Sequence, residues 1–415
     1  MASLPPNPVK RMVRLDVLRG VAISLVLLAH LPFDQPIDWI GYPILESLIL
    51  SGWTGVDLFF VLSGFLISGL LFREYQHSGT IDVTRFLLRR GLKIWPSYYV
   101  AFGTLLLVEV AKPCFSGGSP EWHLIPKTWP SWVFLQNYAH NQWSWSWSLA
   151  VEEHFYIGLP LLLLAVMGFC RTRRVHLRSK VFITMIAAIC LVVLCARTRL
   201  CFYYSATTWK PMYYPTHLRA DSLLFGVLIG YAFHFHRAWL DKLRPYRLAI
   251  TVVAVLLFLP VAIWPIGTNR YVPSVGFAAL YLASGGILVV TMLTEWSHCP
   301  RGYARLFRPA LGVLRFLGIY SYTIYIMHFA LYALFPETNS LLRAYFTLQW
   351  GLGPFTATLA VCLVYGAQAV GSGMVLSHAI ERPALAWRER RFAHRRAEHC
   401  DLQHSIPGQA MGVPS

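Results

Sequence analysis

Ten apolar segments, each long enough to cross the hydrocarbon core of a bilayer, run through this chain of 415 residues. Hydrophobic residues make up 56% of the sequence and charged residues only 13%, so a soluble protein of this length could not hydrate its surface. We therefore predict an all-α, polytopic membrane protein with about ten transmembrane helices. The predicted spans are residues 17–33, 44–72, 94–111, 148–169, 181–200, 217–235, 248–266, 273–294, 313–335 and 353–380.

The second segment is longer than one span requires. We expect a re-entrant or interfacial piece within it, around Gly52–Gly55.

The basic residues fall in short clusters between the apolar segments. With the N-terminus inside, 28 of the 36 lysines and arginines lie in cytoplasmic segments and seven in outer loops, and Arg219 lies within a span. This asymmetry follows the positive-inside rule and places both termini in the cytoplasm. The net charge of +17 is therefore a topology signal, and no nucleic-acid partner is predicted. We expect a multi-pass protein of a bacterial-type inner (plasma) membrane.

The chain divides into a cytoplasmic segment (1–13), one membrane domain (14–391) and a polar tail (392–415) that we predict to be disordered. The first apolar segment carries ionisable residues and lacks a small-residue cleavage site, so it is interpreted as a retained span. The cysteines lack the spacing of metal ligands, and no metal site is predicted. Cys114 and Cys201 both fall on the predicted outer side and could pair.

His30 lies in the first apolar segment, where an ionisable ring is costly to keep and its default interpretation is a functional site. It follows Arg14 by sixteen residues, or about 24 Å of helix, which places it in the outer half of the membrane. The same reasoning brings further ionisable groups from other spans to this depth. They are Asp57, Glu152, Glu153, Arg219, Asp221 and His328.

Two of these placements have alternatives. His328, in a tyrosine-rich segment, could be a hydrogen-bonded packing residue. Arg219 and Asp221 are two residues apart and so do not share a helical face, which predicts different partners for them. Glu152 could orient His30 or bind an acceptor.

A second cluster of charge lies at the predicted inner face. Guanidinium groups bind phosphate bidentately and stay charged, so such a cluster at a membrane mouth suits a phosphate-bearing ligand. For any one residue, plain positive-inside charge is the alternative. The cluster comprises Arg14, Arg85, Arg89, Arg90, Lys93 and Arg382.

A phosphate-binding cluster at the inner face and an imidazole deeper in the membrane suit a long amphipathic donor such as acyl-coenzyme A. Histidine is the natural base for moving an acyl group from a thioester to a hydroxyl, because its ordinary pKa is near neutrality.

Seven collinear motifs over residues 14–391 resemble the membrane-bound acyltransferase-3 family, integral-membrane O-acyltransferases of sugars and related acceptors. They are Leu15-Asp-Val-Leu-Arg-Gly20 with His30, Gly55-Val-Asp-Leu-Phe-Phe-Val-Leu-Ser-Gly-Phe-Leu-Ile67, Arg85-Phe-Leu-Leu-Arg-Arg-Gly-Leu-Lys-Ile-Trp-Pro96, Trp147-Ser-Leu-Ala-Val-Glu-Glu-His-Phe-Tyr156, Arg219-Ala-Asp221, Gly318-Ile-Tyr-Ser-Tyr-Thr-Ile-Tyr-Ile-Met-His328 and Ile380-Glu-Arg-Pro383.

The resemblance implies transfer of an acyl group, usually acetyl, from cytosolic acyl-coenzyme A to a hydroxyl. It implies that His30 is catalytic and that Arg14 is essential. It also implies that Glu152, rather than Glu153, is the functional glutamate of the Trp147–Tyr156 motif. The family's donor motif, Arg-x-x-Arg, reads Arg90-Gly-Leu-Lys93 here, and the lysine keeps the charge but loses the bidentate fork.

We therefore predict a membrane O-acyltransferase with acyl-coenzyme A, most simply acetyl-coenzyme A, as co-substrate and a carbohydrate or glycosylated acceptor. No permanently bound cofactor is expected, and the sequence does not indicate the oligomeric state. An acyl-histidine intermediate is the variant mechanism. The alternative function is a proton-coupled transporter or flippase of a glycan-linked or acylated substrate.

The predicted site residues fall into three groups. The catalytic residues are His30, Glu152 and Asp57, the donor-binding residues are Arg14, Arg89, Arg90 and Lys93, and the acceptor-binding residues are Arg219, Asp221, His328 and Glu153.

Overall fold

The computed structural model describes residues 13–33, 42–139, 144–172, 180–205, 207–294, 301–329 and 337–392. Within these ranges the chain is helical and contains no β-strand, which confirms the prediction of an all-α fold. The segment before residue 13 and the polar tail after residue 392 lie outside the described residues, so the predicted disorder of the tail stays a prediction.

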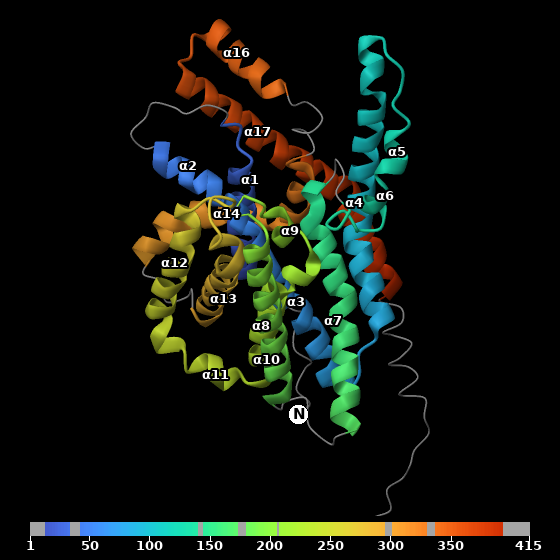
Figure 1. The fold of residues 1–415 in the computed structure, drawn as a ribbon, viewed down its shortest axis with the longest axis vertical. Coiled ribbons are helices and arrows are strands. Elements are labelled where there is room, and N and C mark those ends of the chain that lie inside the picture. The colour runs from blue at the N-terminus through green and yellow to red at the C-terminus, as the bar shows by residue number, and fades with distance from the viewer. Residues whose placement is uncertain are drawn as a thin grey trace, which may run out of the picture.

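Each of the ten predicted spans coincides with a helix (Figure 1). These helices are α1 (Val13–Ala29), α3 (Gly55–Ser78), α4 (Val83–Ala111), α7 (Trp147–Thr172), α8 (Lys180–Tyr203), α10 (Ala220–Phe235), α12 (Arg247–Ile263), α13 (Phe277–Leu293), α14 (Arg301–Met327) and α17 (Pro354–Leu376).

Among the described residues, eight helices are long and apolar enough to cross a membrane. The two of the ten that fall short of this criterion are α1, with 17 residues, and α10, with 16. The protein is thus a polytopic membrane protein. The count of ten spans and the cytoplasmic location of both ends stay predictions.

The over-long second segment is broken where the sequence predicts a discontinuity. Helix α2 (Tyr42–Ser51) ends at a 3₁₀ turn, Gly52–Thr54, and α3 begins at Gly55. Helix α2 is tied to the end of α12, because the Ser47 hydroxyl donates to the Ala262 carbonyl at 2.5 Å. Figure 1 shows α2 leaving the bundle at an angle to α3.

Helices α1 and α14 approach each other at backbone distance. Gly20 lies against the Leu314 carbonyl, and Gly318 lies against the Asp16 carbonyl. A Cβ at either glycine would overlap that carbonyl, so only glycine permits the contact. Small residues bring membrane helices together in this way because lipid supplies no hydrophobic drive for their association.

A second reciprocal pair of glycines joins α3 to α10. Gly64 lies against the Leu223 carbonyl and Gly226 against the Val61 carbonyl. Gly64 and Gly226 therefore let α3 and α10 pack backbone against backbone.

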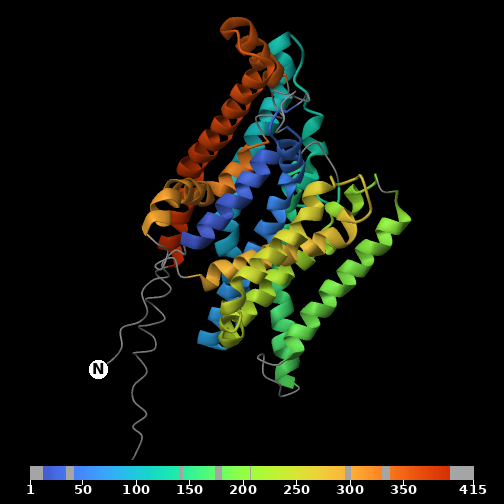
Figure 2. The same cartoon turned by 90° about the vertical axis from the view of Figure 1, so that its left-hand side faces the viewer.

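The two pairs form the centre of the bundle. Figure 1 shows α4 and α7 on one side of α1 and α3, and α12 and α13 on the other. Figure 2 shows α8 standing at the edge of the bundle. Shorter helices occupy the ends of the bundle: α5 (Leu124–Lys127), α6 (Trp129–Trp132), α9 (Lys210–Tyr213), α11 (Arg237–Asp241) and α16 (Thr338–Trp350).

Cys114 and Cys201 are both unpaired thiols, so the disulfide that the sequence allowed is not present.

Replacing Gly64 by alanine should lower the free energy of unfolding by about 1–3 kcal/mol, because the new methyl group meets a backbone carbonyl that cannot rotate away. Thermal unfolding in detergent measures the effect. The control is Gly103→Ala in α4, where an added Cβ meets nothing within 4 Å and alanine's helix propensity should leave stability equal or slightly higher. Equal unfolding temperatures for the two variants would contradict the close approach of α3 and α10.

Candidate functional site

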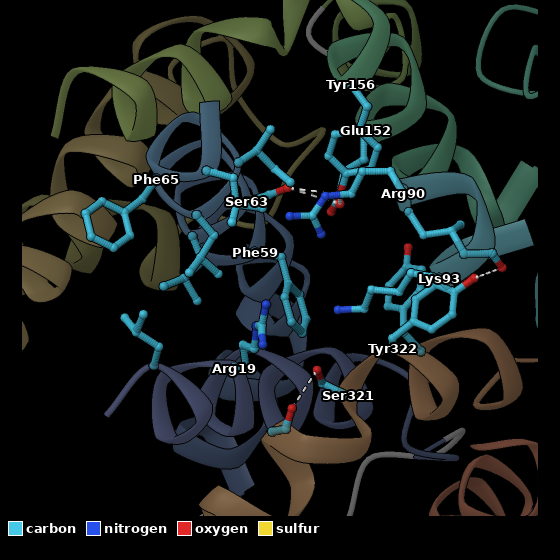
Figure 3. Close-up of a pocket in the computed structure, with 18 of the residues that line it drawn as sticks. Arg19, Phe59, Ser63, Phe65, Arg90, Lys93, Glu152, Tyr156, Ser321 and Tyr322 are labelled. Atoms are coloured by element: carbon cyan, nitrogen blue, oxygen red, sulfur yellow. Dashed lines mark hydrogen bonds between the residues drawn. The ribbon is translucent and has the colours of Figure 1, made fainter. Parts of the chain in front are cut away.

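A cavity of about 570 Å³ opens between α1, α3, α4, α7, α10, α14 and the segment that follows α17 (Figure 3). Its walls carry an unusual number of ionisable and hydroxyl groups for the interior of a membrane protein. The polar residues that line it are Asp16, Arg19, Ser63, Arg73, Arg90, Lys93, Ser148, Glu152, Glu153, Tyr156, His234, Ser321, Tyr322, Tyr325, Ser377, Glu381 and Arg382.

The cations that line the cavity are carried by α1, α3, α4 and the segment after α17, and Arg90 and Lys93 are those of α4. Arg90 and Lys93 are three residues apart and therefore share one face of α4. The guanidinium carbon of Arg90 lies 6.0 Å from the centre of the Tyr156 ring. Figure 3 shows Arg90 and Lys93 directed toward the same space as Arg19 of α1. Two of the four predicted donor-binding residues thus meet in one cavity.

Arg89 does not belong to this group, contrary to the prediction. One position along α4 turns a side chain by about 100°, and Arg89 accordingly points away from the cavity. Its Nη2 lies 4.0 Å from Oε1 of Glu389, and its guanidinium carbon lies 5.7 Å from the Phe392 ring centre. Arg89 therefore anchors the C-terminal end of the last helical segment to α4.

Arg14 is also separated from Arg90 and Lys93. It lines a more open hollow beside the cavity, together with Val13, Phe233, Arg237 and Met292. The prediction that Arg14, Arg90 and Lys93 line one phosphate-binding site is therefore wrong for Arg14. The reason is that the first turn of α1 faces α13 rather than α4. Arg14 Nη1 donates to the Thr291 carbonyl at 3.5 Å.

Two adjacent carboxylates of α7 face the cavity. Glu152 accepts hydrogen bonds from the Tyr156 hydroxyl and from Ser63 Oγ, the latter at 3.2 Å. Glu153 accepts from Trp95 Nε1 at 3.1 Å, while its other oxygen, Oε1, is buried without a hydrogen-bond partner in the described part of the chain. No described hydrogen bond links Glu152 to His30, so Glu152 does not orient that ring directly.

His30 and His328 meet where α1 and α14 end. Their ring centres are 4.8 Å apart in an edge-to-face arrangement. His30 Nδ1 lies 2.9 Å from the Val26 carbonyl, and His328 Nδ1 lies 2.6 Å from the Tyr325 carbonyl. A carbonyl only accepts, so both Nδ1 atoms carry a proton, and in the neutral ring each Nε2 atom then presents a lone pair. The predicted convergence of these two histidines is confirmed.

The histidine pair lies behind the cavity wall, since neither ring is part of the lining. Tyr325 and Ser148 line the cavity at this point, and their hydroxyl oxygens are 2.5 Å apart. The Tyr325 ring centre lies 5.3 Å from that of His328. Both hydroxyls were missed by the sequence reasoning. The signal was present, because Tyr322, Tyr325 and His328 repeat every three residues and so share a helical face.

Asp57 and Arg219 form a buried ion pair outside the cavity. Arg219 Nη2 lies 2.8 Å from Asp57 Oδ1, and both side chains are completely buried. Ser222 Oγ donates to the same carboxylate oxygen at 3.1 Å, and the guanidinium carbon lies 4.1 Å above the Phe277 ring centre. The position of this pair joins α3 to α10 and does not support a catalytic role for Asp57 or an acceptor-binding role for Arg219.

Asp221 forms the second buried pair, with Arg197 of α8. Arg197 Nη2 lies 2.9 Å from Asp221 Oδ2, and Arg197 Nη1 donates to the Leu218 carbonyl at 2.8 Å. Arg197 is thus completely buried within α8. The prediction that Arg219 and Asp221 serve different partners is confirmed, but both roles are structural.

Residues 12–367 match the family model described as an acyltransferase domain, the acyltransferase-3 model. The chain therefore belongs to the acyltransferase-3 family.

Three curated relatives illustrate the similarity. The peptidoglycan O-acetyltransferase OatA of Listeria monocytogenes is 24% identical over 77% of this chain and 49% of its own length. A putative O-acetyltransferase of Staphylococcus aureus is 26% identical over 76% and 50%, and the putative peptidoglycan O-acetyltransferase YrhL of Bacillus subtilis is 28% identical over 76% and 48%. The chain spans about half the length of these relatives. No solved structure matches it.

Replacing Arg219 by methionine should destabilise the protein by about 3–5 kcal/mol, because it leaves the Asp57 carboxylate buried without its counter-ion. The double variant Arg219→Met/Asp57→Asn should lose less than the sum of the single variants. Thermal unfolding of all four proteins measures the coupling. The control, Asp241→Asn, breaks a half-exposed pair and should change stability by about 1 kcal/mol or less. Additive losses would show that the pair is not a unit.

Proposed function

We propose that this protein is a membrane-embedded O-acyltransferase that transfers an acetyl group from acetyl-coenzyme A to a hydroxyl of a cell-envelope carbohydrate. The observation that carries the proposal is one cavity with Arg90 and Lys93 in its wall and the His30–His328 pair directly behind its outer end. Membership of the acyltransferase-3 family supports the reaction class. The relatives support the acyl group and the acceptor class, because OatA is named a peptidoglycan O-acetyltransferase and YrhL a putative one.

The donor would enter from the predicted cytoplasmic face. Its phosphates suit a site with several cations, and its thioester must reach histidines that lie about 24 Å of helix beyond Arg14. A carrier with a long flexible arm meets both requirements. Lys93 supplies charge without the planar fork of arginine, so in this proposal Arg90 makes the bidentate contact.

The chemistry centres on His30 Nε2. The acceptor hydroxyl gives its proton to this lone pair while its oxygen attacks the thioester carbonyl. The C–S bond then breaks, the acyl group remains on the acceptor oxygen, and the proton is returned to the departing thiolate. His328 packs edge-to-face on His30 and holds its ring in place. The same Nε2 lone pair would be the nucleophile if the reaction passed through an acyl-histidine.

Tyr325 and Ser148 stand where the thioester would meet His30. Both residues form the wall between the cavity and the histidines. The hydrogen bond between their hydroxyls must therefore open before the thioester can react at His30. Once separated, each hydroxyl is a donor able to stabilise the oxygen of a tetrahedral intermediate.

His30→Ala should reduce acetyl transfer by about 100-fold or more, because the variant has no general base at this position. The assay uses purified protein in nanodiscs with labelled acetyl-coenzyme A and envelope carbohydrate, analysed by mass spectrometry. The control is His77→Ala, an exposed residue at the end of α3. Transfer at the wild-type rate by His30→Ala would overturn the mechanism. Transport of an acylated glycan into proteoliposomes without any transfer would favour the transporter alternative.

Lys93→Met should raise the KM for acetyl-coenzyme A by about tenfold with a smaller effect on kcat, because it removes one phosphate-facing charge. Lys93→Arg should restore the wild-type KM. Lys180→Met, an exposed lysine at the start of α8, is the matched control. A loss of kcat at unchanged KM would place Lys93 in the chemistry rather than in donor binding.

A further inference from the structure

The hollow that contains Arg14 adjoins the main cavity. Five residues from α1, α10, α13 and the start of α11 line it: Val13, Arg14, Phe233, Arg237 and Met292. Phe233 also lines the cavity itself, so its side chain contributes to the walls of both spaces. We call this space the side hollow. A ligand that passes Phe233 would occupy both spaces at once.

Arg237 is held in place over Phe233. Its guanidinium carbon lies 4.5 Å from the Phe233 ring centre, which is the geometry of a cation–π contact. Its Nε lies 3.5 Å from Asp241 Oδ1, and the same oxygen lies 3.7 Å from Arg244 Nη2. One carboxylate is thus shared by two arginines. In the described part of the chain no hydrogen bond engages the Nη atoms of Arg237.

The side hollow therefore combines positive charge with apolar surface. Arg14 and Arg237 supply the charge, while Phe233, Met292 and Val13 supply apolar contacts. The positive charge suits a phosphate group, and the apolar surface suits the stacking of a flat heterocyclic base. An inorganic anion alone would leave the apolar surface without a function.

We propose that the side hollow binds the 3′-phosphorylated adenosine of coenzyme A, with the 3′-phosphate on Arg14 and Arg237 and the adenine against Phe233 and Met292. This inference rests on the proposed function. The remainder of the donor passes Phe233 into the cavity, where Arg19 and Arg90 lie on its path toward His30. Arg237 is thereby a donor-recognition residue that lies outside the family's Arg-x-x-Arg position. An anionic lipid headgroup shares the phosphate chemistry, but the continuity with the cavity favours the donor.

The test compares coenzyme A with 3′-dephospho-coenzyme A, which differs only by the phosphate in question. Dissociation constants are measured by calorimetry on the full-length protein in nanodiscs of neutral lipid. The wild type should bind dephospho-coenzyme A about tenfold more weakly than coenzyme A. Arg237→Gln should weaken coenzyme A by about tenfold and leave dephospho-coenzyme A unchanged, so that the discrimination disappears.

Arg171→Gln is the matched control, because it removes one exposed arginine at the end of α7 that lines neither space. A variant that fails to fold would lose both ligands equally, whereas the proposal requires loss of discrimination alone. If the Arg237→Gln variant kept the wild-type ratio of affinities for coenzyme A and dephospho-coenzyme A, the inference would be overturned. Loss of bound phosphatidylglycerol from that variant, seen by native mass spectrometry at an unchanged ratio, would assign the hollow to lipid.

The outcomes also separate this inference from the proposed function. If the wild type binds neither form of coenzyme A, both fail together. If His30-dependent transfer occurs and Arg237→Gln keeps the wild-type ratio, only the inference about the side hollow fails.

Discussion

Backbone contact between α1 and α14 is the constraint on which the site depends. Gly20 and Gly318 each lie against a carbonyl of the opposite helix, so the two helices pack backbone against backbone. This alignment brings His30 at the end of α1 against His328 at the end of α14. It also places Arg19 in the wall of the cavity that α3, α4 and α7 complete. In a membrane, where lipid does not drive helices together, such contact requires residues without a side chain.

Burial sorts the ionisable groups into two kinds. Asp57 with Arg219, and Asp221 with Arg197, are completely buried and neutralise each other, so each pair holds helices together. Arg90, Lys93, Glu152 and Glu153 instead face a shared cavity. A charge kept at membrane depth needs either a counter-ion or a ligand. The first group has the counter-ion, and the second group is arranged for a ligand.

The sequence was most informative where one helix carries the whole pattern. The three-residue spacing of Arg90 and Lys93 put them on one face of α4, and the depth of His30 and His328 predicted that they would meet. It was least informative where neighbours along the chain diverge. Arg89 is adjacent to Arg90 but points to Glu389, because successive helical positions differ by about 100°. Asp57 and Glu152 were predicted at one depth, but depth says nothing about which side of a helix faces the cavity.

The sequence by itself determined the all-α membrane architecture, the break before Gly55 and the family, because hydrophobic length, glycine position and local motifs are properties of short segments. Only the tertiary structure decided which charges are paired and which line a cavity, and that Tyr325, which lines the cavity with Ser148, packs against His328. It also separated Arg14 from Arg90 and placed Phe233 in the walls of both spaces. These relations depend on how each helix is rotated about its own axis, and that rotation is set by contacts between residues far apart in the chain.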